Sequence, residues 1–418
     1  MIVAGGATAL LLPLWLSPLE QGYYFTFISL LAIQILFELG LNQIIVQLVS
    51  HEVAFLTEIS EGVYDGPKYH LDRLSSLLQL VSVWYGTAAF VFALSAGAAG
   101  YLFFIKSGPL ESSNYITVWF FLVGCTAINL WLSPRLSVIE GFSKVEQVVR
   151  LRIVQAVLGY MAIWCALFAG AGLWAPTALP AINAVCTFCW LRFGQHTHWL
   201  EHRKVDVVNR MVWRKDVLPL QWRIASSWIS GYLIFNLFTP TVFSEYGAAE
   251  AGKLGVALTM FSALSTIGMS WISAKASNFT IHIARGERAE LNLLFKRLFI
   301  WSTAVTTILC LFVTLIAFYL SESGFPIMTR ISSPIVMSMI AITCVVNVVI
   351  YSMAVYMRSH REEPMVLQSI VVALLIVIGL FTWSKSSVFA IVFMYMCVVI
   401  FVSLPWTLKL FISYFRRA

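Results

Sequence analysis

Twelve apolar stretches run through the chain, each long enough, or nearly so, to cross a bilayer. Hydrophobic residues make up 60% of the sequence and charged residues only 11%, whereas a soluble domain carries about a quarter charged residues. The composition therefore predicts a polytopic membrane protein. The expected spans are residues 1–17, 22–49, 77–105, 115–140, 150–172, 175–195, 219–243, 252–276, 297–320, 334–357, 364–384 and 387–412.

Lysine and arginine fall almost entirely on one side of the predicted membrane. When the gaps between spans are assigned alternately to the two sides, 23 of the 27 cations share one side, and only Lys106, Lys253, Arg330 and Lys385 lie on the other. Cytoplasmic loops carry the excess of Lys and Arg, so both termini are expected in the cytoplasm. This rule also accounts for the net charge of +7, which is therefore no sign of nucleic-acid binding.

A polar stretch at Gln195–Lys215 divides the chain into halves of six spans each. We expect an N-terminal bundle at 1–195 with a short first helix, a cytoplasmic linker at 196–218 and a C-terminal bundle at 219–418. The halves resemble each other: Gly22 and Gly252 begin spans two and eight at an offset of 230 residues. Six is an even number, so the repeats are parallel and related by a pseudo-two-fold axis along the membrane normal. The predicted fold class is all-α, with two six-helix bundles and a cleft suited to alternating access.

Span two carries three polar residues, Gln34, Glu38 and Asn42, at the spacing of four that places them on one helix face. A carboxylate at the middle of a span is costly unless it faces a cavity or a partner. Either Glu38 is a protonation or ion-coupling site in a wet cleft, flanked by the two amides, or it is a buried carboxyl that is protonated or paired with an arginine.

Three cations lie at similar depth near the cytoplasmic ends of spans four, seven and eight: Arg135, Arg223 and Lys275. Each can snorkel to the lipid head groups. Alternatively, the three converge at the inner mouth of the cleft, where arginine would recognise a pyrophosphate through its planar fork. Asn129 joins them as a candidate substrate-binding residue, and Pro134 is expected to kink its helix.

The remaining reactive residues predict no catalytic or metal site. All seven cysteines lie in apolar stretches, and Cys186 and Cys189 have no His or Cys partners at metal-binding spacing. We interpret His196, His198 and His202 as part of a solvated loop. The sequence has no phosphate-binding loop of the GxxxxGK[ST] type, so we expect a carrier and not an enzyme, with no metal or cofactor.

Spans two, four and eight resemble O-antigen translocases, which are lipid-linked oligosaccharide flippases of the multidrug/oligosaccharidyl-lipid/polysaccharide (MOP) exporter superfamily. The resemblance in span two rests on Gly22–Phe27, Ser29–Leu31, Phe37–Leu41, Gln47 and Ser50–Glu52. It extends to Glu140-Gly141 at the end of span four, followed by Arg150 or Arg152, and to Gly252–Trp271.

This resemblance implies a twelve-helix flippase of the bacterial inner membrane. It would move undecaprenyl-pyrophosphate-linked sugar repeat units to the periplasmic leaflet, coupled to H⁺ or Na⁺, beside polysaccharide polymerase and chain-length proteins. A drug or cation antiporter of the same superfamily is the first alternative, although such a carrier should have an acidic lumen. A membrane O-antigen polymerase is the second, although the predicted outside gaps are too short for its large loop.

Overall fold

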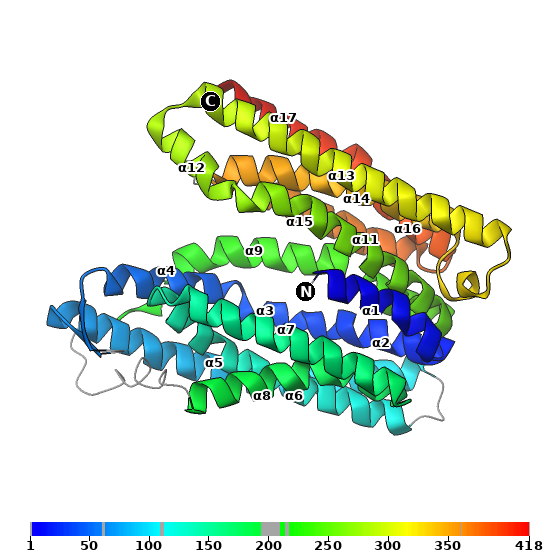
Figure 1. Cartoon of the computed structure of the whole chain (residues 1–418), viewed down its shortest axis with the longest axis horizontal. Helices are drawn as coiled ribbons and strands as arrows, with labels where there is room; N and C mark the ends of the chain where they lie inside the picture. Colours follow the sequence, from blue (N-terminus) through cyan, green and yellow to red (C-terminus); the bar gives the residue numbers. More distant parts are fainter. Residues whose placement is uncertain are drawn as a thin grey trace. The chain divides into compact units, whose positions relative to one another are not determined.

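The computed structural model describes residues 2–60, 63–108, 113–193, 210–213, 217–360 and 362–417 (Figure 1). Within these ranges ten helices are long and apolar enough to cross a membrane. The shorter apolar α1 and the α9–α10 pair bring the total to the twelve predicted segments. The prediction of an all-α polytopic protein is therefore confirmed, with one small addition, a β-hairpin.

The described residues form two compact units, and we describe each by itself. Unit 1 comprises residues 30–229 and unit 2 comprises residues 2–29 and 230–418. The elements within unit 1 are η1 (Ala32–Gln34), α3 (Ile35–Glu38), α4 (Leu41–Val53), β1 (Thr57–Ser60), β2 (Val63–Asp65), α5 (Lys68–Ser107), α6 (Ser113–Gly141), α7 (Val145–Phe168), η2 (Gly172–Thr177), α8 (Ala178–Phe193) and most of α9 (Leu218–Phe235).

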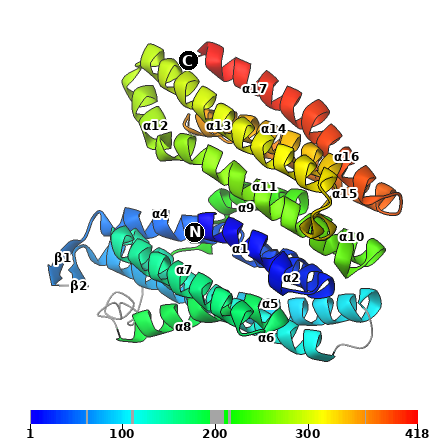
Figure 2. The same cartoon turned by 45° about the vertical axis from the view of Figure 1, so that its right-hand side comes forward.

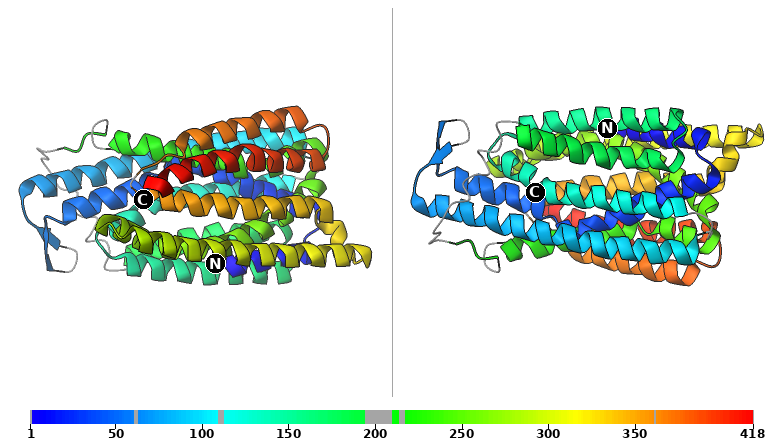
Figure 3. Two further views of the ribbon diagram at one scale, coloured as in Figure 1. Left: turned by 90° about the horizontal axis from the view of Figure 1, so that it is seen from above. Right: turned by 90° about the horizontal axis from the view of Figure 1, so that it is seen from below.

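Unit 2 contains the N-terminal helices as well as the C-terminal part of the chain, and its long helices run along a common direction (Figure 3). Its elements are α1 (Ile2–Trp15), most of α2 (Pro18–Leu31), α10 (Phe238–Tyr246), α11 (Ala248–Ala274), α12 (Ala276–Arg285), α13 (Arg288–Glu322), η5 (Pro326–Arg330), α14 (Pro334–Arg358), α15 (Val366–Trp383), α16 (Val388–Val398), the π-helical η6 (Val399–Ser403) and α17 (Leu404–Arg417).

The compact units do not coincide with the predicted halves at 1–195 and 219–418. Residues 2–29 pack in unit 2, and α9 begins in unit 1. Of the predicted linker 196–218, only residues 210–213 and 217–218 lie among the described residues.

The β-hairpin was not predicted. It joins α4 to α5, with Thr57 opposite Asp65 and Glu58 opposite Tyr64 in an antiparallel register (Figure 2). The two strands contain Ile59, Val63 and Tyr64, residue types that favour strands. A gap too short for a domain thus still contains a regular element.

Close packing of glycines holds α2 against α11 in unit 2. A Cβ atom on Gly22 would lie 1.8 Å from the carbonyl oxygen of Ala248, and one on Gly252 would lie 2.9 Å from the backbone nitrogen of Gly22. Small residues allow helix backbones to approach in this way inside a membrane. The two glycines that the sequence relates by the repeat offset of 230 are therefore direct neighbours.

The turn between α1 and α2 is fastened by Arg330, which the sequence identified only as one of four cations on the sparsely charged side. The Arg330 guanidinium donates to the carbonyl of Leu16 and to Gln21 Oε1, and the Gln21 amide donates to the Arg330 carbonyl at 2.9 Å. Ser17 and Glu20 add a reciprocal capping box at the start of α2. These bonds explain why the N-terminal helices belong to unit 2.

We predict that Gly22→Ala destabilises the protein, because the new methyl group would overlap a backbone carbonyl that cannot rotate away. Overpacking of this kind costs about 1–3 kcal/mol or more. Gly86→Ala in α5 is the matched control, since a Cβ there would meet no described atom within 4 Å. Thermal unfolding of the purified variants in detergent is the measurement. Equal midpoints for the two variants would contradict the packing argument.

Candidate functional site

The second span is broken near its middle, where the sequence predicted one continuous helix. Helix α3 ends at Glu38, Leu39 and Gly40 have left-handed backbone conformations with φ of 47° and 68°, and α4 begins at Leu41. Glycine adopts this conformation without steric cost, but leucine does so rarely. A Cβ on Gly40 would also lie 2.2 Å from Cγ2 of Ile224. The break is therefore maintained by its surroundings in unit 1.

A hydrogen-bonded cluster lies beside the break. The Asn42 amide donates to Glu38 Oε2 at 3.3 Å and to Ser133 Oγ at 3.4 Å, and the Tyr85 hydroxyl donates to Asn42 Oδ1 at 2.9 Å. Glu38 and Asn42, which were predicted only to share a helix face, are thus hydrogen-bonded to each other, although the helix is interrupted between them. Gln34 is half-buried in η1, and none of the described bonds of the cluster includes it.

Two members of this cluster, Tyr85 and Ser133, were not predicted. Tyr85 is fully buried in α5, and Ser133 precedes the proline of α6. A cluster drawn from four helices, α3 to α6, depends on how the helices are aligned with one another, which a single sequence does not reveal. The clues available were the unexplained polar residues at these two positions of apolar spans.

Pro134 lies inside α6, where it leaves one backbone carbonyl of the helix without its usual donor. Proline has no N–H to donate to the carbonyl four residues earlier, which is that of Leu130. The Ser133 hydroxyl donates to this carbonyl instead, at 3.1 Å. Serine side chains commonly satisfy backbone groups freed by proline in membrane helices. Ser133 thus connects the proline site in α6 to Asn42 and, through it, to Glu38.

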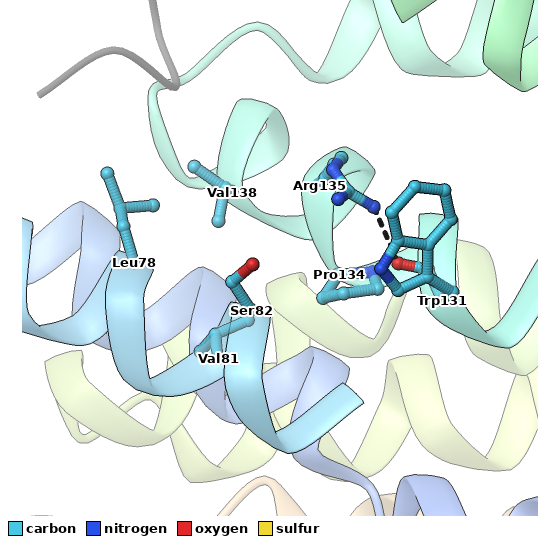
Figure 4. Close-up of a pocket in the computed structure, with 7 residues that line it drawn as sticks. All are labelled: Leu78, Val81, Ser82, Trp131, Pro134, Arg135 and Val138. Atoms are coloured by element: carbon cyan, nitrogen blue, oxygen red, sulfur yellow. Dashed lines mark hydrogen bonds between the residues drawn. The ribbon is translucent and has the colours of Figure 1, made fainter. Parts of the chain in front are cut away.

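Arg135 lines a pocket of about 130 Å³ in unit 1 (Figure 4). The guanidinium donates to the carbonyl of Trp131 at 2.8 Å and lies 4.2 Å from the centre of a Trp131 ring. The other lining residues come from the same helix, α6, and from α5: Leu78, Val81, Ser82, Pro134 and Val138. The carbonyl bond and the cation–π contact hold the guanidinium over the ring and leave it partly accessible.

The other predicted substrate-binding residues have different surroundings. The Asn129 amide donates to the carbonyls of Cys125 and Pro180 at 2.9 and 2.8 Å, so it links α6 to α8. Lys275 is exposed between α11 and α12. Arg223 lies in α9, and its side chain is outside the described residues. Arg135 is therefore the predicted cation with a described pocket around it.

Residues that carry the family resemblance at the ends of spans two and four lie together in unit 1. Ser50 donates to the carbonyl of Gly141 at 2.9 Å, and a Cβ on Gly141 would lie 2.6 Å from that of Val49. Glu140 pairs with Arg152 at 2.7 Å. Their described contacts join α4, α6 and α7, so these residues contribute to packing.

Double-mutant cycles test the Glu38 cluster. Asn42→Leu should destabilise the protein because it removes the partners of Glu38 and Tyr85 at once. Tyr85→Phe should then cost less in the Asn42→Leu background than in the wild type, with a coupling energy of about 0.6–1.7 kcal/mol. Equilibrium unfolding in detergent measures each variant. Additive effects would show that the Tyr85–Asn42 bond makes no contribution.

Solved structures of MOP-superfamily transporters share this fold. The structural match to the lipid II flippase MurJ, in an inward closed conformation, covers 98% of this chain and 85% of the MurJ chain. Its TM-score is 0.65 and the sequence identity is 13%. An inward-facing multidrug resistance MATE family transporter of the MOP superfamily matches 99% and 94%, with a TM-score of 0.61 and 13% identity. A MATE transporter in the straight conformation matches 100% and 95%, with a TM-score of 0.52 and 13% identity.

No protein-family model matches the sequence, and no curated protein matches it. At 13% identity the structural matches establish the fold alone. They confirm the predicted resemblance at that level: the chain is a multi-pass membrane protein with the fold of MOP-superfamily transporters.

Proposed function

We propose that the protein is a flippase for polyprenyl-pyrophosphate-linked oligosaccharides. It would move undecaprenyl-pyrophosphate-linked O-antigen or similar repeat units from the cytoplasmic to the periplasmic leaflet of the bacterial inner membrane by alternating access. The observation that carries the proposal is the broken second span with its polar cluster, because discontinuous helices near the bilayer midplane are where secondary transporters build their sites. The family resemblance of the same span supplies the substrate class.

The orientation in this proposal follows from the lysine and arginine distribution, which places both termini in the cytoplasm. Polymerase and chain-length proteins would receive the product on the periplasmic side. The protein would perform no chemistry of its own, since flipping makes and breaks no covalent bond.

We assign Arg135 to the pyrophosphate head group, with Arg223 and Lys275 as further cations near the cytoplasmic ends of their helices and Asn129 as a neighbouring polar contact. A guanidinium held over Trp131 is oriented before the ligand arrives, so little side-chain freedom is lost on binding. Its planar fork can bind two phosphate oxygens at once, which an ammonium group does not do.

Replacing Arg135 tests this assignment. Arg135→Ala should lower transport at least about tenfold, because a hydrogen bond to a charged group contributes about 1.5–3 kcal/mol, and Arg135→Lys should fall between the two. Arg150→Ala is the control, since Arg150 is an exposed cation paired with Glu146 one helical turn away. Surface polysaccharide in a strain that lacks its own flippase is the readout. Wild-type polysaccharide levels with Arg135→Ala would remove Arg135 from the site.

We further propose that Glu38 couples transport to H⁺ or Na⁺, with Asn42 bonded to it and Gln34 nearby in the sequence. Glu38→Gln nearly keeps the shape of the side chain and its bond to Asn42 but removes the charge. Flipping should slow while the protein level stays constant, and the dependence of the rate on pH or Na⁺ should weaken. Glu245→Gln, an exposed carboxyl in α10, is the control. An unchanged pH and Na⁺ dependence in Glu38→Gln would leave Glu38 a structural role.

A drug or cation antiporter is the second candidate, favoured by the MATE transporters of the same fold and by the acidic Glu38. Uptake of a cationic dye by cells that express the protein separates the two. An antiporter should lower dye accumulation when a Na⁺ or H⁺ gradient is present, whereas the proposed flippase should not.

A further inference from the structure

Each unit carries a charged cluster at the junction of two consecutive helices. These helices are α4 and α5 in unit 1, and α12 and α13 in unit 2. In unit 1 the residue on the first helix is Glu52, which is 1% exposed. It accepts from His70 Nδ1 at 2.7 Å and from Arg73 Nε at 2.9 Å. His70 and Arg73 lie in the first two turns of α5, so an acid on one helix holds two basic side chains of the next.

In unit 2 the residue on the first helix is His282, near the end of α12. Its Nδ1 lies 2.7 Å from Glu287 Oε2 and 3.6 Å from Glu290 Oε2. Glu287 is the N-cap of α13, and Glu290 lies in its first turn. Phe279, fully buried one turn before His282, anchors α12 to the core of unit 2.

Two sequence offsets relate the members of the two clusters. The offset of 230 residues that relates Gly22 to Gly252 also relates Glu52 to His282. An offset of 217 relates His70 to Glu287 and Arg73 to Glu290. At each of these three pairs of positions, an acidic residue in one cluster stands against a basic residue in the other.

The reversal changes the charge balance. In unit 1 the carboxylate faces a guanidinium, so its charge is compensated. In unit 2 an imidazole faces two carboxylates. Besides this imidazole, the described ion pairs of the two carboxylates include one cation, Arg285. Its guanidinium lies 3.9 Å from Glu287, and its side chain is 66% exposed. Such an exposed, long contact contributes little. Counted over these ion pairs, the cluster of His282, Glu287 and Glu290 therefore has an excess of negative charge.

We propose that His282, Glu287 and Glu290 bind a divalent transition-metal ion, with Zn²⁺ as the best match. One imidazole nitrogen and two carboxylate oxygens lie within 4.8 Å of one another. Zn²⁺ binds such donors at about 2.0–2.2 Å in a tetrahedral arrangement, which separates the donors by about 3.3 Å. The distance of 3.6 Å from His282 Nδ1 to Glu290 Oε2 is close to this value. Glu287 Oε2 is now hydrogen-bonded to His282 Nδ1 at 2.7 Å, so it must move about 0.6 Å away from the imidazole to make room for the ion.

The imidazole sets the metal class, because nitrogen donors favour Zn²⁺ and its neighbours over Mg²⁺ and Ca²⁺, which prefer oxygen ligands. A cavity of about 290 Å³ adjoins the cluster, and the charged or titratable side chains among its lining residues are His282, Arg288, His360, Glu362 and Tyr414. It leaves room for water or a fourth side chain to complete the tetrahedron. The bound ion would join α12 to α13 across the Gly286 turn, where Arg73 makes the corresponding connection in unit 1.

Zn²⁺ titration of the purified protein tests the site independently of transport. The protein carries an affinity tag without histidines and is treated with a chelator, and isothermal titration calorimetry is run with Zn²⁺ and with Mg²⁺. Wild-type protein should bind Zn²⁺ at this site and show no heat with Mg²⁺. Glu290→Arg, which copies the charge arrangement of unit 1, should weaken Zn²⁺ binding by at least about tenfold.

Zn²⁺ should also raise the unfolding temperature of the wild type, since a ligand that binds the native state stabilises it, but not that of Glu290→Arg. Glu287→Gln repeats the test with a side chain of unchanged shape. His51→Ala is the control, because it removes an exposed imidazole beside the unit 1 cluster and should leave Zn²⁺ affinity unchanged. Equal Zn²⁺ affinity in the wild type, Glu290→Arg and Glu287→Gln would show adventitious binding only and overturn the proposal, as would the absence of Zn²⁺ binding to the wild type.

Discussion

A bilayer offers no water to hydrogen-bond with the backbone, so irregular chain at membrane depth persists only where protein or a polar cavity surrounds it. The left-handed residues Leu39 and Gly40 place such irregular chain near the middle of the second span. The polar groups of Glu38, Asn42, Tyr85 and Ser133 lie beside it in one hydrogen-bonded cluster. The polar interior of unit 1 and the break in the helix are therefore two aspects of the same requirement.

The same requirement links the cluster to the candidate head-group residue. Pro134 frees the carbonyl of Leu130, and the Ser133 hydroxyl donates a hydrogen bond to it. The same hydroxyl accepts a hydrogen bond from the side-chain amide of Asn42. Arg135 follows Pro134 directly in the sequence. A movement at the break in span two would therefore also displace the segment of α6 that carries the Arg135 guanidinium. In the proposed function, this chain of contacts is the physical route by which an ion at Glu38 acts on substrate binding.

Much of the fold could be predicted because hydropathy and the Lys/Arg distribution act on each span separately. Helical periodicity predicted that Glu38 and Asn42 face the same side of span two, but not that they are bonded to each other. The sequence did not indicate the break between them, because glycine also occurs in unbroken membrane helices, and Leu39 gives no sign of its unusual conformation. Tyr85 and Arg330 were missed since their roles arise from contacts between distant segments. Gly22 and Gly252 were recognised as equivalent positions of two repeats, but their direct contact appears only in three dimensions.

The central claim is that this chain moves a lipid-linked oligosaccharide across a bilayer, and transport by the purified protein in liposomes tests it most directly. The liposomes contain a fluorescent undecaprenyl-pyrophosphate oligosaccharide, and an enzyme added outside cleaves the sugar from the outer leaflet only. The account predicts that wild-type protein under an ion gradient exposes the inner-leaflet oligosaccharide to cleavage, while a fluorescent phospholipid without the sugar stays protected from an external quencher. Cleavage that stops at the outer-leaflet fraction, as in protein-free liposomes, would contradict it, and so would equal movement of the phospholipid.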